Sequence, residues 1–517
     1  MNAHTNGSKP GSPGTNGYPA PSRRHTRLRV GIVGAGFCGS TLAVRLLRSH
    51  CAEQLEIILL EREGVFGPGL AFGKARPTNL LNVPAGNMSA LDDDAGHFLR
   101  WAQELDPATR TGDFLPRRLY GQYIKQLLDD AAAQSRALFT RVAGDAADVR
   151  KVHAGPSSPG ESAPIDETEI VLASGQVVRC DQVVLCLGNF PPAPLAGLPD
   201  SLELNGSVVG DPWNPLALAN LDPEADLLLV GTGLTMVDIA SELRQAGHRG
   251  TVHAVSRRGL LPASHRGPSK PPAPRQAPEQ LASWDGKALS LLRIMRGAIT
   301  QATLDGIDWR EVITSIRGIT PSLWQRMDLQ QRQKFIRHIR TYWETARHRV
   351  SPVVAKGLKE AMAQGSLVIH AGRITSATQQ SGKVAVCLAP RGSAADEARI
   401  LLVSRVINCT GPECDIARSD DRLLQSLVSK GQIRPDPLRM GADCTPAGAV
   451  IDRDGIVSDF LYVAGPLRKG LLWETTAVPE LRKQVSELAA HLTATLRTET
   501  PVVETRTGTS SVAGHAI

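Results

Sequence analysis

The stretch LRVGIVGAGFCGSTLAVRLL, residues 28–47, begins as a short apolar strand and passes through closely spaced glycines into a helix. The residues of this turn are Gly34, Gly36, Phe37, Cys38 and Gly39. In a G-x-G-x-x-G turn the first glycine permits a tight bend, the second lets a diphosphate approach the backbone, and the third lets the helix pack closely on the strand. The helix N-terminus then presents free N–H groups to the diphosphate. The stretch therefore predicts a dinucleotide-binding unit.

A carboxylate follows this turn at the distance expected of a ribose ligand. The next strand, EIILLE, ends in Glu61, where an acid about 20 residues beyond the turn accepts hydrogen bonds from ribose hydroxyls and disfavours a 2′-phosphate. FAD and NAD both satisfy these residues, so the turn alone does not separate them. The alternative is a glycine turn without a ligand. The preceding strand, the following helix and the acid argue against it.

A second stretch, LLLVGTGLTMVDIASEL at 227–243, repeats the strand, turn and helix. It supplies Gly231 and Gly233, but Met236 stands where the third small residue is expected. We therefore expect this helix to lie slightly farther from its strand, or the methionine to fold away from the contact.

The strand after this second turn ends in cations instead of an acid. Arg257 and Arg258 follow TVHAVS and occupy the place that Glu61 has in the first unit. Guanidinium groups bind phosphates bidentately, and NADP carries a 2′-phosphate at this position. The contrast predicts one adenosine site without a 2′-phosphate and one with it. The alternative is a pair of solvent-exposed loop arginines.

Composition narrows the class of protein. The chain has 517 residues, of which 42% are apolar, and a formal net charge of +7. Residues 1–27 carry four cations and residues 262–276 carry three, with no acids in either segment. The rest is balanced, so we expect no nucleic-acid partner. No apolar run approaches the ~20 residues of a membrane span. Eight cysteines without a C-x-x-C pair indicate reduced thiols and a cytoplasmic location.

Three later segments run from an apolar strand into a turn: DQVVLCLGNFPP (181–192), RVINCTGPE (405–413) and FLYVAGPLRKGLLWETTAVPELRKQ (460–484). They resemble the strand ends of two-dinucleotide-domain flavoproteins at which the chain crosses between domains. More specifically, three motifs together resemble a bacterial family of FAD/NAD(P)-binding proteins over most of residues 28–496: GPGLAFGKARPTNLLNVPAGNMSALDDDAGHFLRW (67–101), VGTGLTMVD and GPLRKGLLWETTAVPELR.

More distantly, GTGLTMVD is similar to the NADPH-binding turn of flavin monooxygenases. Thr235 replaces the serine of that pattern, Asp238 is retained and Met236 departs from it. The departure leaves open whether NADPH or NADH is used.

The resemblance implies FAD on the first unit and NADPH on the second. The residues that it implies near the cofactors are Asn82, Val83, Met88, Thr410, Gly411, Gly465 and Trp473. For Trp473 the alternative is a core position beneath the last helix.

The predicted fold class is α/β, with two Rossmann-like dinucleotide-binding domains for FAD and NADP and a helical insertion. The expected segments are a disordered tail (1–27), the FAD-binding domain (28–205 and 411–496), the NADP-binding domain with a Pro-rich loop (206–278), a helical region (279–364), return strands of the NADP domain (365–410) and a second disordered tail (497–517).

The resemblance implies a FAD-dependent, NADPH-linked oxidoreductase. We expect a monooxygenase that uses O₂ to hydroxylate nitrogen or carbon of a small molecule. The alternatives are an NADPH-dependent flavin reductase or dehydrogenase without oxygenation, and a non-catalytic redox sensor. A disulfide reductase needs a cysteine pair against the flavin, whereas Cys409 and Cys414 lie far along the chain. The sequence assigns no catalytic residue, metal site or oligomeric state.

A basic segment, FIRHIRTYWETARHR at 335–349, has two interpretations. Arg340, Trp343 and Arg347 fall on one helical face. This face is either a clamp for an anionic substrate or cofactor phosphate, or a solvated surface around a core tryptophan.

Overall fold

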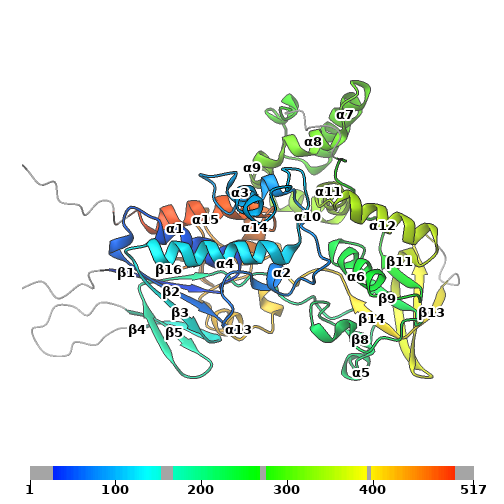
Figure 1. The fold of residues 1–517 in the computed structure, drawn as a ribbon, viewed down its shortest axis with the longest axis horizontal. Coiled ribbons are helices and arrows are strands. Elements are labelled where there is room, and N and C mark those ends of the chain that lie inside the picture. Colours follow the sequence, from blue (N-terminus) through cyan, green and yellow to red (C-terminus); the bar gives the residue numbers. More distant parts are fainter. Residues whose placement is uncertain (1–26, 153–166, 268–274, 393–397, 495, 497–517) are drawn as a thin grey trace, which may run out of the picture.

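We describe the protein from a computed structural model, which covers residues 27–152, 167–267, 275–392, 398–494 and 496. The predicted tails therefore lie outside the described residues, apart from residue 27. Two mixed sheets form the body, and a group of helices projects from it (Figure 1).

The first sheet has the strand order β15-β16-β7-β1-β2-β3. Its strands are β1 (Leu28–Val33), β2 (Leu55–Glu61), β3 (Leu138–Ala143), β7 (Gln182–Leu185), β15 (Ala449–Ile451) and β16 (Val457–Val463). All neighbours pair in parallel except β15 with β16. The inner strands are covered on both faces, as in parallel sheets, and five of the six residues of β1 are buried. The edge strand β3 has no buried residue.

Helices cover one face of this sheet and a small sheet covers the other. The helices in contact with one another are α1 (Phe37–Leu47), α4 (Arg117–Gln134) and α15 (Val478–Leu492). The opposite face packs on α13 (Arg422–Ser429) and on the antiparallel strands β4 (Ala146–Val152), β5 (Glu167–Leu172) and β6 (Val177–Cys180). Shorter helices of this domain are α2 (Gly69–Gly73) and α3 (His97–Leu105).

The second sheet has the order β13-β12-β11-β10-β9-β14-β8. Its strands are β8 (Val208–Val209), β9 (Leu227–Val230), β10 (Val252–Ser256), β11 (Leu367–Gln380), β12 (Lys383–Pro390), β13 (Arg399–Val403) and β14 (Arg405–Asn408). The strands from β11 to β8 pair in parallel, whereas β11, β12 and β13 pair antiparallel. The associated helices are α5 (Asp200–Leu204), α6 (Leu234–Gln245) and α12 (Pro352–Ala363).

The projecting group comprises α7 (Ala288–Leu304), α8 (Trp309–Ser315), α9 (Thr320–Arg326), α10 (Leu329–His338) and α11 (Arg340–Arg347). It has its own aromatic core around Trp284, Trp324 and Phe335. The helical region was predicted to extend to residue 364, but α12 packs on α6 and β11. Its apolar residues Leu358 and Ala361 belong to the core of the second sheet, so α12 is a crossover helix of that sheet.

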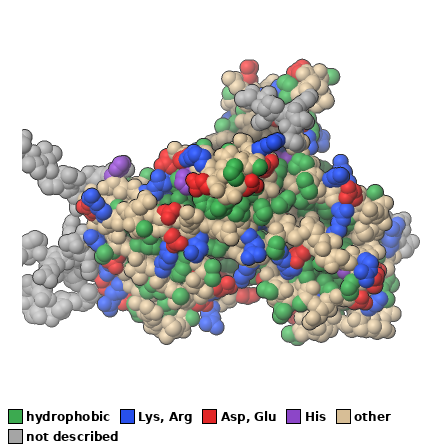
Figure 2. All heavy atoms as spheres, in the orientation of Figure 1, with side chains coloured by type: hydrophobic (Ala, Val, Ile, Leu, Met, Phe, Trp, Pro, Cys, Tyr) green, Lys and Arg blue, Asp and Glu red, His purple; other side chains and the backbone are tan. Residues whose placement is uncertain are grey.

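The predicted fold class is confirmed: the chain forms two Rossmann-like α/β units with a helical insertion. Figure 2 shows basic and acidic side chains interspersed over the visible face, consistent with the balanced charge of the body. Within the described residues, every helix is too short or too polar to cross the hydrocarbon layer of a membrane.

Candidate functional site

The first glycine turn has no room for side chains at two of its positions. Gly34 has φ +97°, and a Cβ there would lie 2.5 Å from the carbonyl oxygen of Cys186. A Cβ on Gly39 would lie 1.9 Å from the carbonyl oxygen of Gly34. Helix α1 therefore approaches β1 as closely as backbone allows. Gly36 is its N-cap, with no side-chain cap and no acid in the first turn, so the helix end suits a diphosphate.

Glu61 is fixed to this turn by its own side chain. Its Oε2 accepts a hydrogen bond of 2.7 Å from the backbone N–H of Ala35. Because β1 and β2 are parallel neighbours, their carboxyl ends lie together at this edge of the sheet. The carboxylate therefore has the position expected of a ribose ligand.

A second glycine segment, which the sequence analysis did not select as a site, packs on the same turn. The N–H of Gly67 donates to the carbonyl oxygen of Ala35 over 2.9 Å. Gly69 has φ +54°, and a Cβ there would lie 2.6 Å from the Cα of Gly36. The motif GPGLAFG in the sequence could have indicated a second close backbone approach.

The second glycine turn repeats the construction of the first. Gly231 has φ +113°, and a Cβ there would lie 2.3 Å from the carbonyl oxygen of Cys409. Gly233 is the N-cap of α6, again without a side-chain cap or an acid in the first turn, and the space beside it is open. Met236 is fully buried in the core of this sheet. The missing third glycine is therefore accommodated by packing the methionine inward.

The two arginines lie beside this second turn. The hydroxyl of Thr232 donates to the carbonyl oxygen of Leu260 over 2.6 Å and shares a hydrogen bond of 2.8 Å with the hydroxyl of Ser256. These bonds join the turn after β9 to the turn after β10, which carries Arg257 and Arg258. Arg257 is exposed, and the Arg258 guanidinium lies 5.0 Å from the centroid of the Tyr342 ring.

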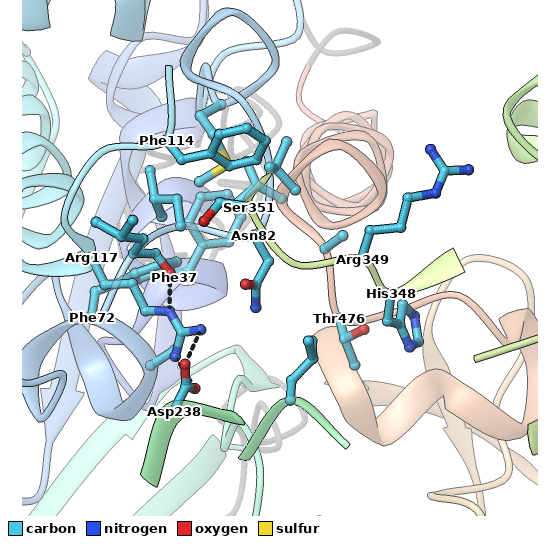
Figure 3. Close-up of a pocket in the computed structure, with 18 of the residues that line it drawn as sticks. Phe37, Phe72, Asn82, Phe114, Arg117, Asp238, His348, Arg349, Ser351 and Thr476 are labelled. Carbon is cyan, nitrogen blue, oxygen red and sulfur yellow. Dashed lines mark hydrogen bonds and ion pairs between the residues drawn. The ribbon is translucent and has the colours of Figure 1, made fainter. Parts of the chain in front are cut away.

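One cavity of about 1500 Å³ joins the two dinucleotide units. It is lined by residues of the first glycine turn, of the N-terminal part of α6, of the crossover segments 186–192 and 411–412, and of α8. The predicted site residues that line it are Gly36, Phe37, Cys38, Asn82, Val83, Met88, Thr235 and Gly411. Figure 3 shows Phe37, Asn82, Asp238 and Thr476 around the same space. Ligand sites of α/β sheets lie at such carboxyl ends.

The remaining predicted residues do not line this cavity. Those that shape its glycine turns or lie behind them are Gly34, Gly39, Glu61, Gly231, Gly233, Arg257, Arg258 and Thr410. Gly465 is also behind the lining, because a Cβ there would lie 3.0 Å from Cys38 Sγ. Burial raises the pKa of the Cys38 thiol to about 12, so Cys38 is a neutral packing residue.

Trp473 lies in the core of the helical group, not over the cavity. Its ring stacks on Trp324 with centroids 4.8 Å apart and meets Phe335 edge-on at 5.1 Å. It is 5% exposed and adopts φ +63°. Of the two interpretations, the structure therefore places Trp473 at a core position, because three aromatic rings bury one another there.

The basic segment 335–349 is divided into two helices, and acids neutralise its selected face. Arg340 pairs with Glu344 at 2.8 Å, and Arg347 pairs with Glu480 at 2.9 Å. The Trp343 indole N–H donates to Glu474 Oε1 over 2.8 Å. Burial raises the pKa of Glu474, but its neighbours, His348 and Arg347 among them, lower it further, to about 2. The face therefore consists neither of unpaired cations that await an anion nor of side chains that only contact solvent.

Cys409 and Cys414 are free thiols, and burial raises the pKa of Cys409, which disfavours a reactive thiolate. Among the described residues no group of three or more His, Cys, Asp and Glu side chains is arranged to hold a metal ion.

Sequence reasoning missed several polar residues that line the cavity. These are Arg117, His265 and Arg310. Asp238, Arg347, His348 and Arg349 also line the cavity. Asp238 was noted only as a retained motif residue, and the other three belong to the basic segment 335–349, for which an anion clamp was one interpretation. Arg117, His265 and Arg310 come from segments that are distant in sequence. No local pattern brings them together, so only the assembled chain identifies them.

Comparisons with known proteins agree with this geometry. A family model described as FAD-NAD(P)-binding matches residues 31–190, while the comparison with curated proteins finds no match. An ornithine N-hydroxylase from Kutzneria sp. 744 has 15% identity and a TM-score of 0.58, over 92% of this chain and 100% of that chain. The ornithine hydroxylase from Pseudomonas aeruginosa has 13% identity and a TM-score of 0.60, over 91% of this chain and 99% of that chain. A cadaverine monooxygenase from Erwinia amylovora has 14% identity and a TM-score of 0.56, over 95% of this chain and 99% of that chain.

The chain thus has the fold of proteins with two dinucleotide-binding domains. The resemblance to FAD/NAD(P)-binding proteins is confirmed by the family match over residues 31–190. At these identities the likeness to the solved structures is one of fold.

Proposed function

We propose that the protein is a FAD-dependent, NADPH-linked monooxygenase that hydroxylates a nitrogen atom of a small amine with O₂. The observation that carries the proposal is the shared cavity, onto which two uncapped helix N-termini from separate sheets converge. Two dinucleotides bound there would meet in one shared cavity, as hydride transfer between them requires.

The residues present fit both cofactors. In the first unit, the backbone at Gly36 would receive the FAD diphosphate and Glu61 the ribose. Asn82, Val83 and Met88 would lie beside the flavin ring. In the second unit, the backbone at Gly233 and the side chain of Thr235 would face the NADPH diphosphate. Arg257 and Arg258 would bind its 2′-phosphate.

The protein's own contribution is to orient the reactants and to exclude water. When bound, FAD accepts a hydride from NADPH and supplies the electrons that reduce O₂. The reaction is balanced when an amine, O₂, NADPH and one proton yield the hydroxylamine, NADP⁺ and water. The apolar residues Val83, Met88 and Leu481 line the cavity and would keep bulk water from this chemistry.

The choice of nitrogen as the hydroxylated atom rests on the similar structures, which are ornithine and cadaverine hydroxylases. A small molecule and O₂ are the proposed partners, and the cytoplasm is the proposed location. A reductase without oxygenation and a redox sensor differ from the monooxygenase in measurable ways.

The proposal predicts that the purified protein carries FAD and oxidises NADPH faster when a suitable amine is present. The measurement combines the flavin spectrum, NADPH consumption and detection of hydroxylamine across a panel of diamines and amino acids. Hydrogen peroxide release that no amine converts into product would instead indicate the reductase. A flavin that NADPH reduces only once, without turnover, would indicate the sensor.

We also infer that the end of the cavity near α8 binds an anionic group of the substrate. Arg349 is 9% exposed and lines the cavity. Its Nε donates to the carbonyl oxygen of Ala346 over 2.9 Å. No carboxylate of the described chain lies within ion-pair distance of it. Burial, together with the nearby Arg310 and Arg347, lowers the pKa of Arg349 to about 10, and a bound anion would relieve this penalty. In Figure 3 its guanidinium points away from Asn82.

Replacing Arg349 with methionine should therefore raise KM about 10- to 100-fold for an amine that carries a carboxylate, which corresponds to the loss of one charged hydrogen bond. KM for an amine without a carboxylate should change little. Arg337→Met is the matched control, because Arg337 is exposed on the same helical group. Equal effects on both kinds of amine would contradict the assignment.

A further inference from the structure

An ion pair joins the two dinucleotide units at the wall of the cavity. Arg117 begins α4 of the first unit, and Asp238 lies in α6 of the second. Arg117 Nη1 and Nη2 donate to the two carboxylate oxygens of Asp238 over 2.7 and 3.1 Å. Both side chains are nearly buried, with 11% and 12% exposed. Figure 3 shows them pointing toward each other beside Asn82.

A second ion pair and a histidine make the same connection. One helical turn beyond Asp238, Glu242 of α6 pairs with Arg76 of the first unit. His265, from the loop after β10, places Nε2 2.9 Å from the backbone carbonyl oxygen of Asn82. Since a carbonyl oxygen can only accept, Nε2 carries the hydrogen. Burial lowers the pKa of His265 to about 4, so this donor is neutral near pH 7.

All three contacts act on one stretch of the first unit, residues 76–82, which we term the cavity strap. Arg76 and Asn82 lie at its two ends. Between them, Arg117 holds the strap directly, because its Nε donates to the carbonyl oxygen of Leu80 over 2.9 Å and its backbone N–H donates to Asn79 over 2.8 Å. Leu81 pairs with Leu115 through a backbone hydrogen bond of 2.8 Å. The strap leads into Asn82 and Val83 on the cavity wall.

The negative charge of Asp238 depends on the neighbouring guanidinium of Arg117. Burial raises the pKa of Asp238, and the charge and hydrogen bonds of Arg117 oppose that effect. A carboxylate without the guanidinium would be buried and uncompensated, which is unfavourable. The pair is therefore stable only while the two units keep this orientation. Helix α6 carries both Asp238 and, one turn earlier, the open end at Gly233.

We propose that Asp238 is a positioning residue, which through Arg117 and the cavity strap fixes the orientation of the second unit relative to the flavin-facing wall. Loss of the pair leaves NADPH and FAD bound but misaligned for hydride transfer. The proposal rests on the proposed function for the hydride step alone. The placement of the strap is independent of it.

The test compares Asp238→Asn and the double variant Arg117→Gln/Asp238→Asn with the wild-type protein containing FAD. The double variant leaves no unpaired buried charge, so it remains informative if the single variant folds poorly. Asp238→Glu is the conservative variant. Glu360→Gln is the matched control. Glu360 of α12 pairs with Arg244 of α6, the helix that carries Asp238, at 2.8 Å, but this pair lies within the second unit.

Two readouts are measured: amide hydrogen exchange of residues 76–82, and the rate of flavin bleaching after rapid mixing with NADPH. We expect faster exchange in the strap and a limiting reduction rate that is about 10- to 100-fold lower, because small misplacements of reacting atoms have effects of this size. FAD content and the Kd for NADPH should stay within about 3-fold of wild type, well below that loss. Asp238→Glu should recover most of the rate, and Glu360→Gln should behave as wild type.

Unchanged amide exchange of the cavity strap in the Asp238 variants would overturn the proposal. A lower rate of flavin reduction would also overturn it if the loss of rate matched a loss of bound FAD, or if Glu360→Gln showed the same loss. If NADPH fails to reduce the wild-type flavin at all, the proposed function is wrong and the hydride role of Asp238 falls with it. Exchange at residues 76–82 then still shows whether Asp238 holds the strap.

Discussion

A Gly39→Val protein is expected to lose bound FAD and to be strongly destabilised. A Cβ at position 39 would lie 1.9 Å from the carbonyl oxygen of Gly34 and 3.2 Å from Ile32 Cγ2. The first contact is with backbone, so no rotamer change relieves it, and α1 must move away from β1. Overpacking of this kind costs about 3 kcal/mol or more. The ratio of flavin to protein absorbance and the urea midpoint measure the two effects.

Two other glycines serve as controls for this prediction. Gly297 lies exposed in α7 with open space around its Cα, so Gly297→Ala should raise stability by up to about 1 kcal/mol. Gly36→Ala meets only an ordinary contact of 3.5 Å with Gly69, so it should keep the fold while weakening FAD binding through the lost diphosphate approach. A flavin content in Gly39→Val equal to wild type would contradict the proposed role of the first turn.

Replacement of Arg257 and Arg258 by glutamate is expected to shift the coenzyme preference from NADPH toward NADH. Each guanidinium that binds the 2′-phosphate contributes about 1.5–3 kcal/mol as a charged hydrogen bond. An acid in its place adds repulsion and can accept the ribose hydroxyl of NADH. Since every 1.36 kcal/mol is tenfold, the ratio of kcat/KM for the two coenzymes should change by about 100-fold or more. Steady-state kinetics with each coenzyme measure this ratio.

Arg249→Glu is the matched control for the charge change. Arg249 is exposed and lies before β10, at the opposite end of that strand from Arg257. It should leave the coenzyme ratio close to wild type. Because Arg258 also lies over the Tyr342 ring, single variants should show a larger effect for Arg257. A ratio that does not move in the double variant would refute the placement of the 2′-phosphate.

The glycine turns could be predicted from sequence because their geometry is local. Gly34, Gly36 and Gly39 lie within one strand–turn–helix unit. The positive φ of Gly34 and the close approach of Gly39 to Gly34 are demands within that unit, whereas the contacts of Gly34 with Cys186 and of Gly36 with Gly69 appear only in the folded chain. Glu61 follows at the end of the adjacent strand, so its distance from the turn is set by the length of α1. The second turn could be predicted for the same reason, although its tolerance of Met236 could not.

The sequence left two positions open for Trp473 and could not choose between them, because its packing partners come from a different part of the chain. The sequence places this residue after a glycine turn near the expected flavin. In the folded protein the rings of Trp324 and Phe335, from α9 and α10, enclose it. Similarly, α12 has the same helical periodicity as its neighbours, and only its contacts with α6 and β11 assign it to the second sheet.

The amino-acid sequence by itself determined the two dinucleotide turns, the opposite charges beyond them and the α/β fold class, since these follow from short-range backbone geometry and residue chemistry. Only the tertiary structure decided that the helix N-termini after the two turns open onto one cavity, that Arg117 and Asp238 pair at its wall, and that Arg349 lines it without a carboxylate partner within the described chain. These features join residues that are far apart in sequence. Their distances are set by the packing of whole sheets and helices, which no local pattern records.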